Sequence, residues 1–209
     1  MCQNCSEISK EDLKISMTDR ELINDILIHN SQKAFEELVN RYQSQVIKIC
    51  LGFVHSTADA EDLTQEVFIE VFQSLNSFRG EAKLSTWLYR IAVNKSLNFV
   101  RKQKRDKIFR SIDSFFSTKG EYSEPLDIID KGGASADGNI DRRENKAMLK
   151  KAINSLPDNQ RIAFILSKYQ DLSYQEISEV MSVTISSVES LLFRAKANLQ
   201  KHLLKEIGK

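Results

Sequence analysis

Apolar side chains recur at intervals of three and four residues along most of the chain, which is the spacing of one face of an α-helix. Two such stripes lie between residues 35 and 75. The first consists of Phe35, Leu38, Val39, Tyr42, Val46, Ile49, Cys50 and Phe53, and the second of Leu63, Val67, Phe68, Val71, Phe72 and Leu75. A further helix is predicted from Ser85 to about Lys104. Because no segment alternates apolar and polar positions for long, as a strand would, the pattern predicts an all-α protein.

The C-terminal part has the layout of a helix-turn-helix. Helices are predicted over 145–155 and 157–169, and Ser173 forms a capping box with Glu176 before a short helix. After a turn, a longer helix covers 185–202. We expect its buried face to comprise Ile185, Val188, Leu192, Ala195 and Leu199, and its opposite face Ser186, Ser190, Phe193, Arg194, Ala197 and Lys201. The opposite face suits a DNA major groove, although antiparallel helix pairs without DNA function are also common.

One of the two prolines, Pro125, and four of the seven glycines fall in residues 106–142, which show no sustained helical period. Such a segment is too long for an ordinary connection inside one domain, so we interpret it as a flexible linker. It divides the chain into a tail over 1–20, a helical domain over 21–105 and the helix-turn-helix domain over 143–209. The linker keeps many apolar side chains, which indicates docking along a partner's groove or packing against its own domains.

The net charge of +1 conceals a strong segregation along the chain. Residues 1–78 carry −7, 79–105 carry +7, 106–142 carry −3 and 143–209 carry +4. Two basic blocks separated by acidic ones suit two contacts with an anion such as nucleic acid and one contact with a different partner. Solvated charged faces are the alternative interpretation.

The helix predicted after Ser85 sorts its side chains by face. One side is apolar, and the other carries Trp87, Arg90, Asn94, Asn98 and Arg101. This mixture suits single-stranded nucleic acid, because cations follow the phosphates, an aromatic ring stacks on a base, and amides bond to the edges of unpaired bases. A solvated amphipathic helix with Trp87 in the core is the competing interpretation.

Several function classes lack support in the sequence. No histidine has the neighbours of a nucleophilic site, and neither a glycine-rich phosphate loop nor an HExxH motif is present, so we expect no enzyme, cofactor or small-molecule substrate. Cys2 and Cys5 form at most half of a zinc site, and a mobile tail is the simpler interpretation, so we expect no metal. An odd cysteine count and the absence of a long apolar run indicate the cytoplasm.

Four motifs together resemble the extracytoplasmic-function (ECF) sigma factors of bacterial RNA polymerase. They are DAEDLTQEVF at 59–68, SFRGEAKLSTWLYRIAVN at 77–94, LPDNQR at 156–161 and LSYQEI at 172–177. The resemblance extends from about Glu21 to His202, apart from the linker.

The resemblance implies that the first motif docks on the β′ clamp helices of core RNA polymerase. Its polar contacts would come from Asp59, Glu61, Asp62, Gln65 and Glu66, while Phe68 packs inward. The linker would thread toward the active-site cleft, adding contacts within the polymerase, including its β subunit. An anti-sigma factor is implied as a further partner.

The resemblance further implies two contacts with promoter DNA. In the −10 element, Phe78, Ile91 and Asn94 would hold a flipped base, with Arg79, Lys83, Trp87 and Arg90 near the strand. At the −35 element, Ser190, Phe193, Arg194 and Lys196 occupy positions that contact DNA in the family, beside the outward-facing Ser186. Glu189 stands where many relatives have a basic residue, and either accepts from a cytosine amino group or faces solvent.

Two other functions compete with a sigma factor. A stand-alone helix-turn-helix regulator would bind intact duplex DNA as a dimer without polymerase. A pure interaction protein that sequesters polymerase would not need the basic face of the helix after Ser85.

Overall fold

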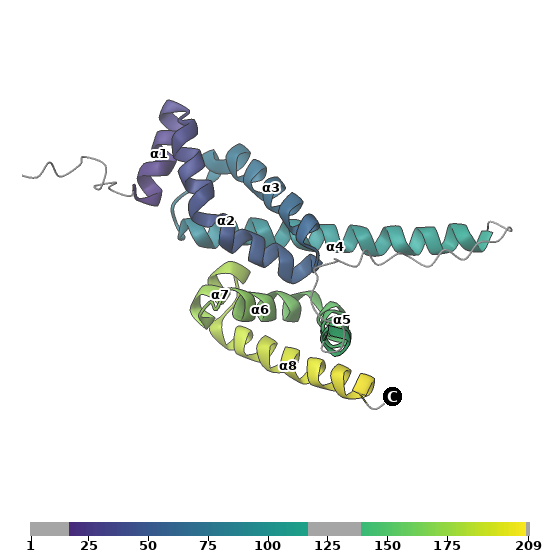
Figure 1. The fold of residues 1–209 in the computed structure, drawn as a ribbon. Coiled ribbons are helices and arrows are strands. Elements are labelled where there is room, and N and C mark those ends of the chain that lie inside the picture. The colour runs from purple at the N-terminus through teal and green to yellow at the C-terminus, as the bar shows by residue number, and fades with distance from the viewer. Residues whose placement is uncertain (1–16, 117–138, 208–209) are drawn as a thin grey trace, which may run out of the picture.

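The computed structural model describes residues 17–116 and 139–207, and the side chains of 17–109 and 144–206. Within these ranges the regular structure is helical, so the all-α prediction is confirmed (Figure 1). The elements are α1 (Asp19–His29), α2 (Gln32–Val54), α3 (Thr57–Ser74), the 3₁₀ turn η1 (Leu75–Ser77), α4 (Leu84–Phe116), α5 (Asn139–Ser155), α6 (Asp158–Tyr169), α7 (Tyr174–Met181) and α8 (Ile185–Ile207). None of these helices is long and apolar enough to cross a membrane.

Short polar side chains begin the helices of the N-terminal half. The hydroxyls of Thr18, Ser31 and Ser56 each accept a hydrogen bond from a backbone amide in the first turn of α1, α2 and α3. Such caps satisfy amide groups that have no partner within the helix. At the other end, α1 and α2 stop where Asn30 and His55 take the left-handed conformation.

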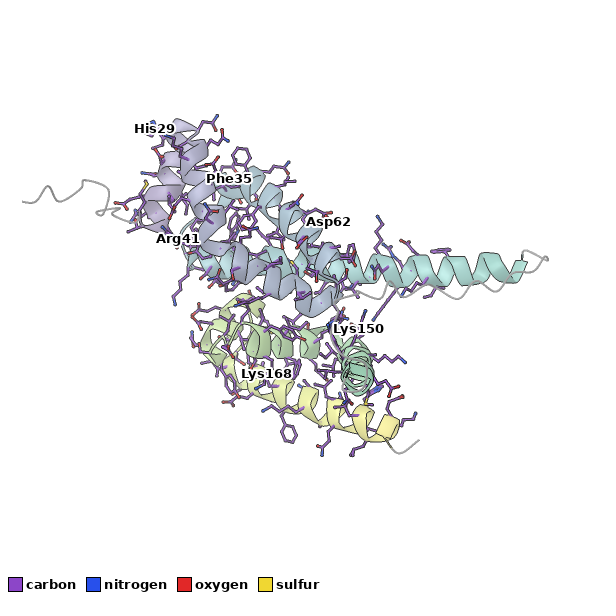
Figure 2. The ribbon with its side chains drawn as sticks, viewed as in Figure 1. His29, Phe35, Arg41, Asp62, Lys150 and Lys168 are labelled. Carbon is purple, nitrogen blue, oxygen red and sulfur yellow. The ribbon has the colours of Figure 1, made fainter. Side chains whose placement is uncertain are left out.

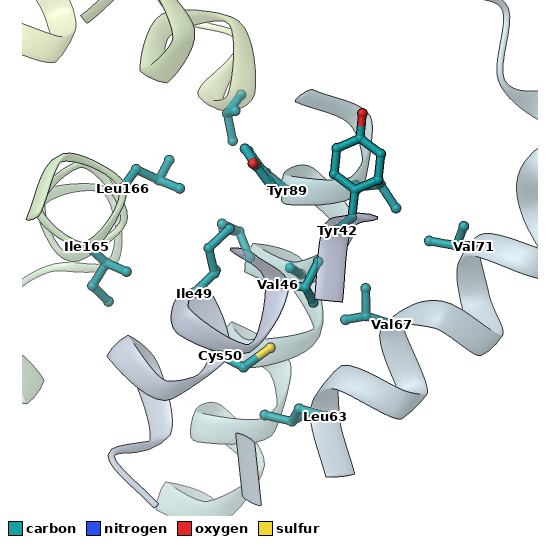
Figure 3. Close-up of a cluster of buried hydrophobic side chains, with 14 of the residues drawn as sticks. Tyr42, Val46, Ile49, Cys50, Leu63, Val67, Val71, Tyr89, Ile165 and Leu166 are labelled. Carbon is teal, nitrogen blue, oxygen red and sulfur yellow. The ribbon is translucent and has the colours of Figure 1, made fainter. Parts of the chain in front are cut away.

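The N-terminal domain is a bundle in which α2 packs against α1, α3 and α4. The predicted stripe on α2 supplies its centre, since Leu38, Val46, Ile49 and Cys50 are fully buried. Figure 3 shows Val46 and Cys50 facing Leu63 and Val67 of α3 across this core. The α3 stripe is confirmed with one correction: Phe72 is 53% exposed, because it lies beside the buried face and not on it.

The C-terminal domain contains the predicted helix-turn-helix in α7 and α8. Ser173 and Glu176 form the expected capping box, and Ser182 closes α7 in the left-handed conformation. Val188 is fully buried between the two helices. Ile185 is a correction to the predicted buried face, because it stands in the first turn of α8 and is 43% exposed.

The two domains pack against each other through α6 and α7 on one side and α2 and α4 on the other. Ile165 and Leu166 of α6 face Ile49 of α2 in Figure 3, and all three side chains are fully buried. Gly52 permits this approach: a Cβ atom there would lie 2.7 Å from Cγ2 of Ile165. The side chain of Gln170 adds a hydrogen bond of 2.7 Å to the carbonyl of Gln45. We call this arrangement the closed form.

The predicted end of the third helix was wrong. Instead of stopping near Lys104, α4 continues to Phe116, so the first part of the expected linker is helical. Figure 1 shows this end of α4 extending well past α2 and α3. The N-terminal tail up to residue 16 and the linker over 117–138 lie outside the described residues.

Candidate nucleic-acid and polymerase interfaces

The −10 face of α4, defined as Trp87, Arg90, Asn94, Asn98 and Arg101, begins beside an aromatic pair. The rings of Phe78 and Trp87 lie 5.4 Å apart with their planes inclined at 49°. Both rings are half-buried against the core, so the interpretation of Trp87 as a packing residue is partly correct. Ile91 is also half-buried one turn further along α4, and Asn94 is exposed. The expected base-binding residues therefore gather on one side of the helix.

The loop before α4 presents the other two cations expected near the strand. Arg79 and Lys83 are exposed, and Gly80 between them has a φ of +72°, which glycine adopts without strain. The ammonium group of Lys83 lies 3.7 Å from a carboxylate oxygen of Glu176 at the start of α7. With Lys83 69% exposed, this ion pair contributes little to stability.

The guanidinium group of Arg90 lies against the C-terminal end of α7. Its Nε donates to the carbonyl of Val180 at 3.2 Å, and its Nη2 donates to the carbonyl of Glu179. The last carbonyls of a helix carry partial negative charge, so a cation is stabilised there. In the closed form two N–H groups of Arg90 are therefore bonded to the end of α7.

Asp158, at the start of α6, joins the far end of the −10 face to the C-terminal domain. Its carboxylate pairs with Arg101 of α4 at 2.7 Å and with the buried Arg161 of α6 at 2.8 Å. Burial alone would raise the pKa of Asp158, but the hydrogen bond from Arg101 and the charge of Arg161 outweigh it and hold that pKa below its ordinary value.

The middle of the −10 face borders a cavity of about 260 Å³ between the domains. Arg90, Val93 and Asn94 line it from α4. Its other walls come from α6, α7 and the turn after α7, through Asn159, Ile162, Val180, Met181 and Ser182. Together with the contacts of Arg90 and Arg101, this shows that the C-terminal domain engages part of the −10 face in the closed form, while Asn94 and Asn98 are exposed.

The −35 face of α8 is open in the same structure. Its expected members Ser186, Glu189, Ser190, Phe193, Arg194 and Lys196 are all exposed, and Phe193 is 75% exposed. The Nε of Arg194 donates to the carbonyl of Ser190 at 3.1 Å, which holds the guanidinium along the helix. The two expected DNA contacts therefore differ: two cations of the −10 face are held by the C-terminal domain, whereas every expected member of the −35 face is exposed.

The expected polymerase contacts lie along the outer side of α3. Glu61, Asp62, Gln65 and Glu66 are exposed and Asp59 is half-buried, while Phe68 packs inward as predicted. Figure 2 shows Asp62 on this helix. The sequence analysis missed the exposed apolar pair on the same helix, Ile69 and Phe72, which are 57% and 53% exposed.

The ring of Phe72 is held in place by Phe35 of α2, with centroids 5.1 Å apart and planes inclined at 72°. Exposed apolar groups beside carboxylates are typical of a protein-binding surface. The sequence could have indicated this pair, because Ile69 and Phe72 follow Gln65 and Glu66 at helical spacing and so share the exposed face of α3 with them.

A buried polar cluster at the domain boundary has no role in the expected sites. Arg161 is fully buried and its guanidinium lies 5.7 Å from the ring centre of Phe53. Near it, burial and the charge of Lys150 lower the pKa of His55 to about 4. Among the described residues, no three His, Cys, Asp or Glu side chains gather as a metal site requires, and Cys2 and Cys5 lie outside them.

Comparison with known proteins identifies both domains. The family model for Sigma-70 region 2 matches residues 38–106, and that for Sigma-70, region 4 matches residues 146–199. The chain is 32% identical to the RNA polymerase sigma-H factor of Pseudomonas aeruginosa, over 88% of this chain and 93% of that protein. It is 34% identical to the ECF RNA polymerase sigma-E factor of Escherichia coli, over 86% of this chain and 91% of that protein.

Solved structures agree with this family. CnrH in complex with the cytosolic domain of CnrY is similar in fold, with a TM-score of 0.61 at 20% identity, covering 88% of this chain and 96% of that one. The sigma factor RpoE of Bartonella quintana, in complex with the anti-sigma factor NepR, gives a TM-score of 0.55 at 25% identity, covering 83% and 98%. The −10 face, the −35 face and the acidic α3 thus lie in the two regions that match one family, and the chain belongs to the ECF sigma factors of RNA polymerase.

Proposed function

We propose that the protein is a sigma factor and that each of the three surfaces described above carries one of its binding functions. The outer side of α3, extended by Ile69 and Phe72, binds the β′ clamp helices of core RNA polymerase. The −10 face of α4, with Phe78, Arg79, Lys83 and Ile91, opens the −10 element and holds its strand. The −35 face of α8 binds the −35 element in the major groove. Together they direct transcription initiation.

The observation that carries this proposal is the composition of the −10 face. Trp87 beside Phe78 offers a stacking surface, Arg90 and Arg101 offer cations, and the exposed Asn94 offers an amide to a base edge. Stacking on an aromatic ring contributes about 1–3 kcal/mol per base, which is comparable to the cost of unstacking that base. Several such contacts can therefore hold one strand of an opened duplex.

The proposal requires the closed form to open. The guanidinium of Arg90 donates two of its five N–H groups to the carbonyls of Glu179 and Val180, and Arg101 shares its charge with Asp158, so both cations are less available to a phosphate than they would be after opening. The −10 face lies on the N-terminal domain and the −35 face on the C-terminal domain. Separating α6 and α7 from α4 therefore frees the −10 face without changing the −35 face. The polymerase can separate the two domains if it binds the open form more tightly than the closed form, since a ligand that prefers one form shifts the population toward it.

The relatives support the remaining parts of the proposal. NepR is an anti-sigma factor bound to a sigma factor of similar fold, so we propose that an anti-sigma factor regulates this chain too. The protein acts without an enzymatic activity, a metal or a cofactor of its own, and it acts in the cytoplasm with RNA polymerase. The division into domains 21–105 and 143–209, with the linker between them, stays a prediction.

A substitution at Asn94 tests the proposal with little risk to the fold, because this side chain is exposed. With core polymerase and a promoter selected by run-off transcription from a genomic pool, Asn94→Ala should bind the core normally but open the promoter at least tenfold less. Asn145→Ala, an exposed amide on α5, is the matched control and should behave as the unsubstituted protein. Unchanged opening by Asn94→Ala would contradict the proposal.

The same reactions separate the competing functions. A stand-alone regulator would bind the intact promoter duplex tightly without polymerase, whereas a sigma factor needs the core enzyme for tight binding. A sequestering protein would bind the core enzyme but reduce transcription from every promoter, with or without Asn94.

A further inference from the structure

A single histidine stands where the two domains meet. The chain has three histidines: His29 and His202 are exposed, whereas His55 ends α2 at the boundary with α5 and α6. The Nε2 atom of His55 is buried and forms no hydrogen bond within the described residues. Imidazole is the side chain whose ordinary pKa lies within the pH range of cells. Because His55 belongs to none of the three functional surfaces, its position at the boundary calls for a separate explanation.

Burial lowers the pKa of His55, and cations of the C-terminal domain lower it further. Lys150 and Lys146 act from α5, and the fully buried Arg161 acts from α6. The side chain of Asn154 offsets only part of this effect, so the pKa of His55 lies at about 4, below its ordinary value of 6.5. A proton on the imidazole would therefore add a positive charge to a site that is already positive and largely out of water.

The carboxylate beside these cations is already engaged. Asp158 of α6 pairs with Arg161 at 2.8 Å and with Arg101 of α4 at 2.7 Å. The pKa of Asp158 is held below its ordinary value of 3.8, so this carboxylate stays ionised at pH 5 and above. Lys104 of α4 adds a further cation to the boundary, since it donates to a backbone carbonyl of α5 at 3.5 Å. Mild acidification therefore changes the charge of His55 and not that of Asp158.

The neighbours that His55 has within its own domain favour the charged imidazole. Its backbone amide bonds to the carbonyl of Leu51 at the C-terminal end of α2, where the last carbonyls carry partial negative charge. Asp59, in the first turn of α3, is the nearest carboxylate in the sequence, although it forms no ion pair with His55 in the closed form. Once α5 and α6 have moved away, the imidazole is solvated and keeps these neighbours. Its pKa should then return to at least about 6.5.

We propose that His55 is a pH-sensitive contact of the closed form, and that its protonation separates α5 and α6 from the end of α2. The imidazole fits the boundary only while it is neutral, because the cations of the C-terminal domain repel a proton there. The open form therefore binds this proton more tightly, and acidification shifts the population toward it. Opening also releases Arg90 from the end of α7, since α7 belongs to the same domain as α5 and α6.

The size of the shift follows from the proton affinities of the two forms. With a pKa of about 4 in the closed form and about 6.5 in the open form, a change from pH 7.5 to 5.5 should move the equilibrium about tenfold toward the open form. The pKa is lower in the closed form, so this form is favoured at high pH and loses its advantage as the pH falls through about 6.5.

An NMR titration of the full chain tests the first part of this inference, which is the environment of the imidazole. The signal that is missing from His55→Asn identifies His55. Its pKa should lie at least about one pH unit below those of His29 and His202, because both of these side chains are exposed.

Small-angle X-ray scattering at pH 7.5 and 5.5 tests the second part, the coupling to domain separation. The measurement uses Gly52→Ala, because a Cβ atom 2.7 Å from Cγ2 of Ile165 weakens the same boundary and populates both forms. This protein should expand on acidification, while circular dichroism shows unchanged helix content. Adding His55→Asn, which keeps the left-handed backbone but cannot be protonated, should abolish the expansion. Adding His29→Asn instead, at an exposed histidine in the last turn of α1, is the matched control and should preserve it.

Three results would overturn the inference. One is a pKa of His55 equal to those of the two exposed histidines. Another is a radius of gyration that does not depend on pH, or whose dependence on pH survives His55→Asn. The third is a loss of helix content that accompanies the expansion, since this would indicate unfolding and not separation of folded domains. Neither polymerase nor promoter DNA takes part in these measurements, so their failure would leave the proposed function untouched.

Discussion

The closed form can be destabilised at Gly52 without altering any residue of the three functional surfaces. In Gly52→Ala the new methyl group would lie 2.7 Å from Cγ2 and 3.4 Å from Cγ1 of Ile165, and 3.5 Å from Cγ of Tyr169. The first distance is far shorter than a normal contact between carbon atoms, so α2 and α6 must move apart. The substitution therefore acts on the packing between the domains.

The size of the effect follows from two opposing contributions. Overpacking of this kind costs about 1–3 kcal/mol, and only the closed form bears this cost. Alanine within a helix is favoured over glycine by about 1 kcal/mol, and both forms gain this contribution because α2 is helical in each. The equilibrium between the closed and open forms should consequently shift by about 1–3 kcal/mol, or roughly 5- to 150-fold, toward the open form.

Small-angle X-ray scattering of the full chain measures this shift directly, because separated domains have a larger radius of gyration. A single-stranded −10 oligonucleotide should also bind more tightly to Gly52→Ala, since Arg90 and Arg101 are released from the C-terminal domain in a larger fraction of molecules. Ser44→Ala, at an exposed position of α2, is the control for helix propensity and should leave the scattering unchanged.

A second substitution identifies the clash itself. In an Ile165→Ala background the facing side chain is shortened, so Gly52→Ala should no longer expand the molecule further, and the two substitutions should be strongly non-additive. If Gly52→Ala leaves the radius of gyration and oligonucleotide binding unchanged, α2 and α6 do not restrain the −10 face, and the reasoning about the closed form is wrong.

Three further predictions concern stability and DNA binding. With the pKa of His55 lowered to about 4, the unfolded chain takes up a proton below pH 6.5 that the folded chain does not, so stability falls by about 2 kcal/mol from pH 6.5 to 5. His55→Asn, which tolerates the left-handed backbone, should flatten this dependence in urea unfolding at the two pH values; an equal slope would contradict the assignment. Ser173→Ala removes the capping box of α7 and should reduce the free energy of unfolding by about 1 kcal/mol, while an unchanged thermal midpoint would show that the cap is dispensable. Phe193→Ala, at a side chain 75% exposed, should change stability by less than about 0.5 kcal/mol but weaken holoenzyme binding to promoters with a −35 element; equal binding would exclude Phe193 from that contact.

The local structure was predictable because the residues that determine it are close together in the sequence. The capping box depends on Ser173 and Glu176, three residues apart, and the core face of α8 depends on the spacing of Val188 and Leu192. The same is true of the −10 face, since helical geometry alone brings Trp87, Arg90 and Asn94 to one side of α4. These patterns also determined the family resemblance.

Periodicity shows which face of a helix is apolar, but it does not show what covers that face. Phe72 and Ile185 belong to apolar rows and are nevertheless exposed, because Phe72 lies beside the buried face of α3 and Ile185 stands in the first turn of α8. The end of α4 was misplaced for a similar reason: the charged residues after Lys104 gave no buried face from which a helical period could be recognised.

The sequence by itself determined the helices, their caps and the chemistry of each surface. Only the tertiary structure decided which of these surfaces is accessible. Gly52 appears in the sequence as an ordinary break in an apolar stripe, and its importance depends on Ile165, more than a hundred residues away in the chain. Likewise, the partners of Arg90 are backbone carbonyls at the end of α7, and backbone carbonyls leave no signature in a sequence. Contacts between distant segments depend on how whole helices pack, and local spacing does not report that packing.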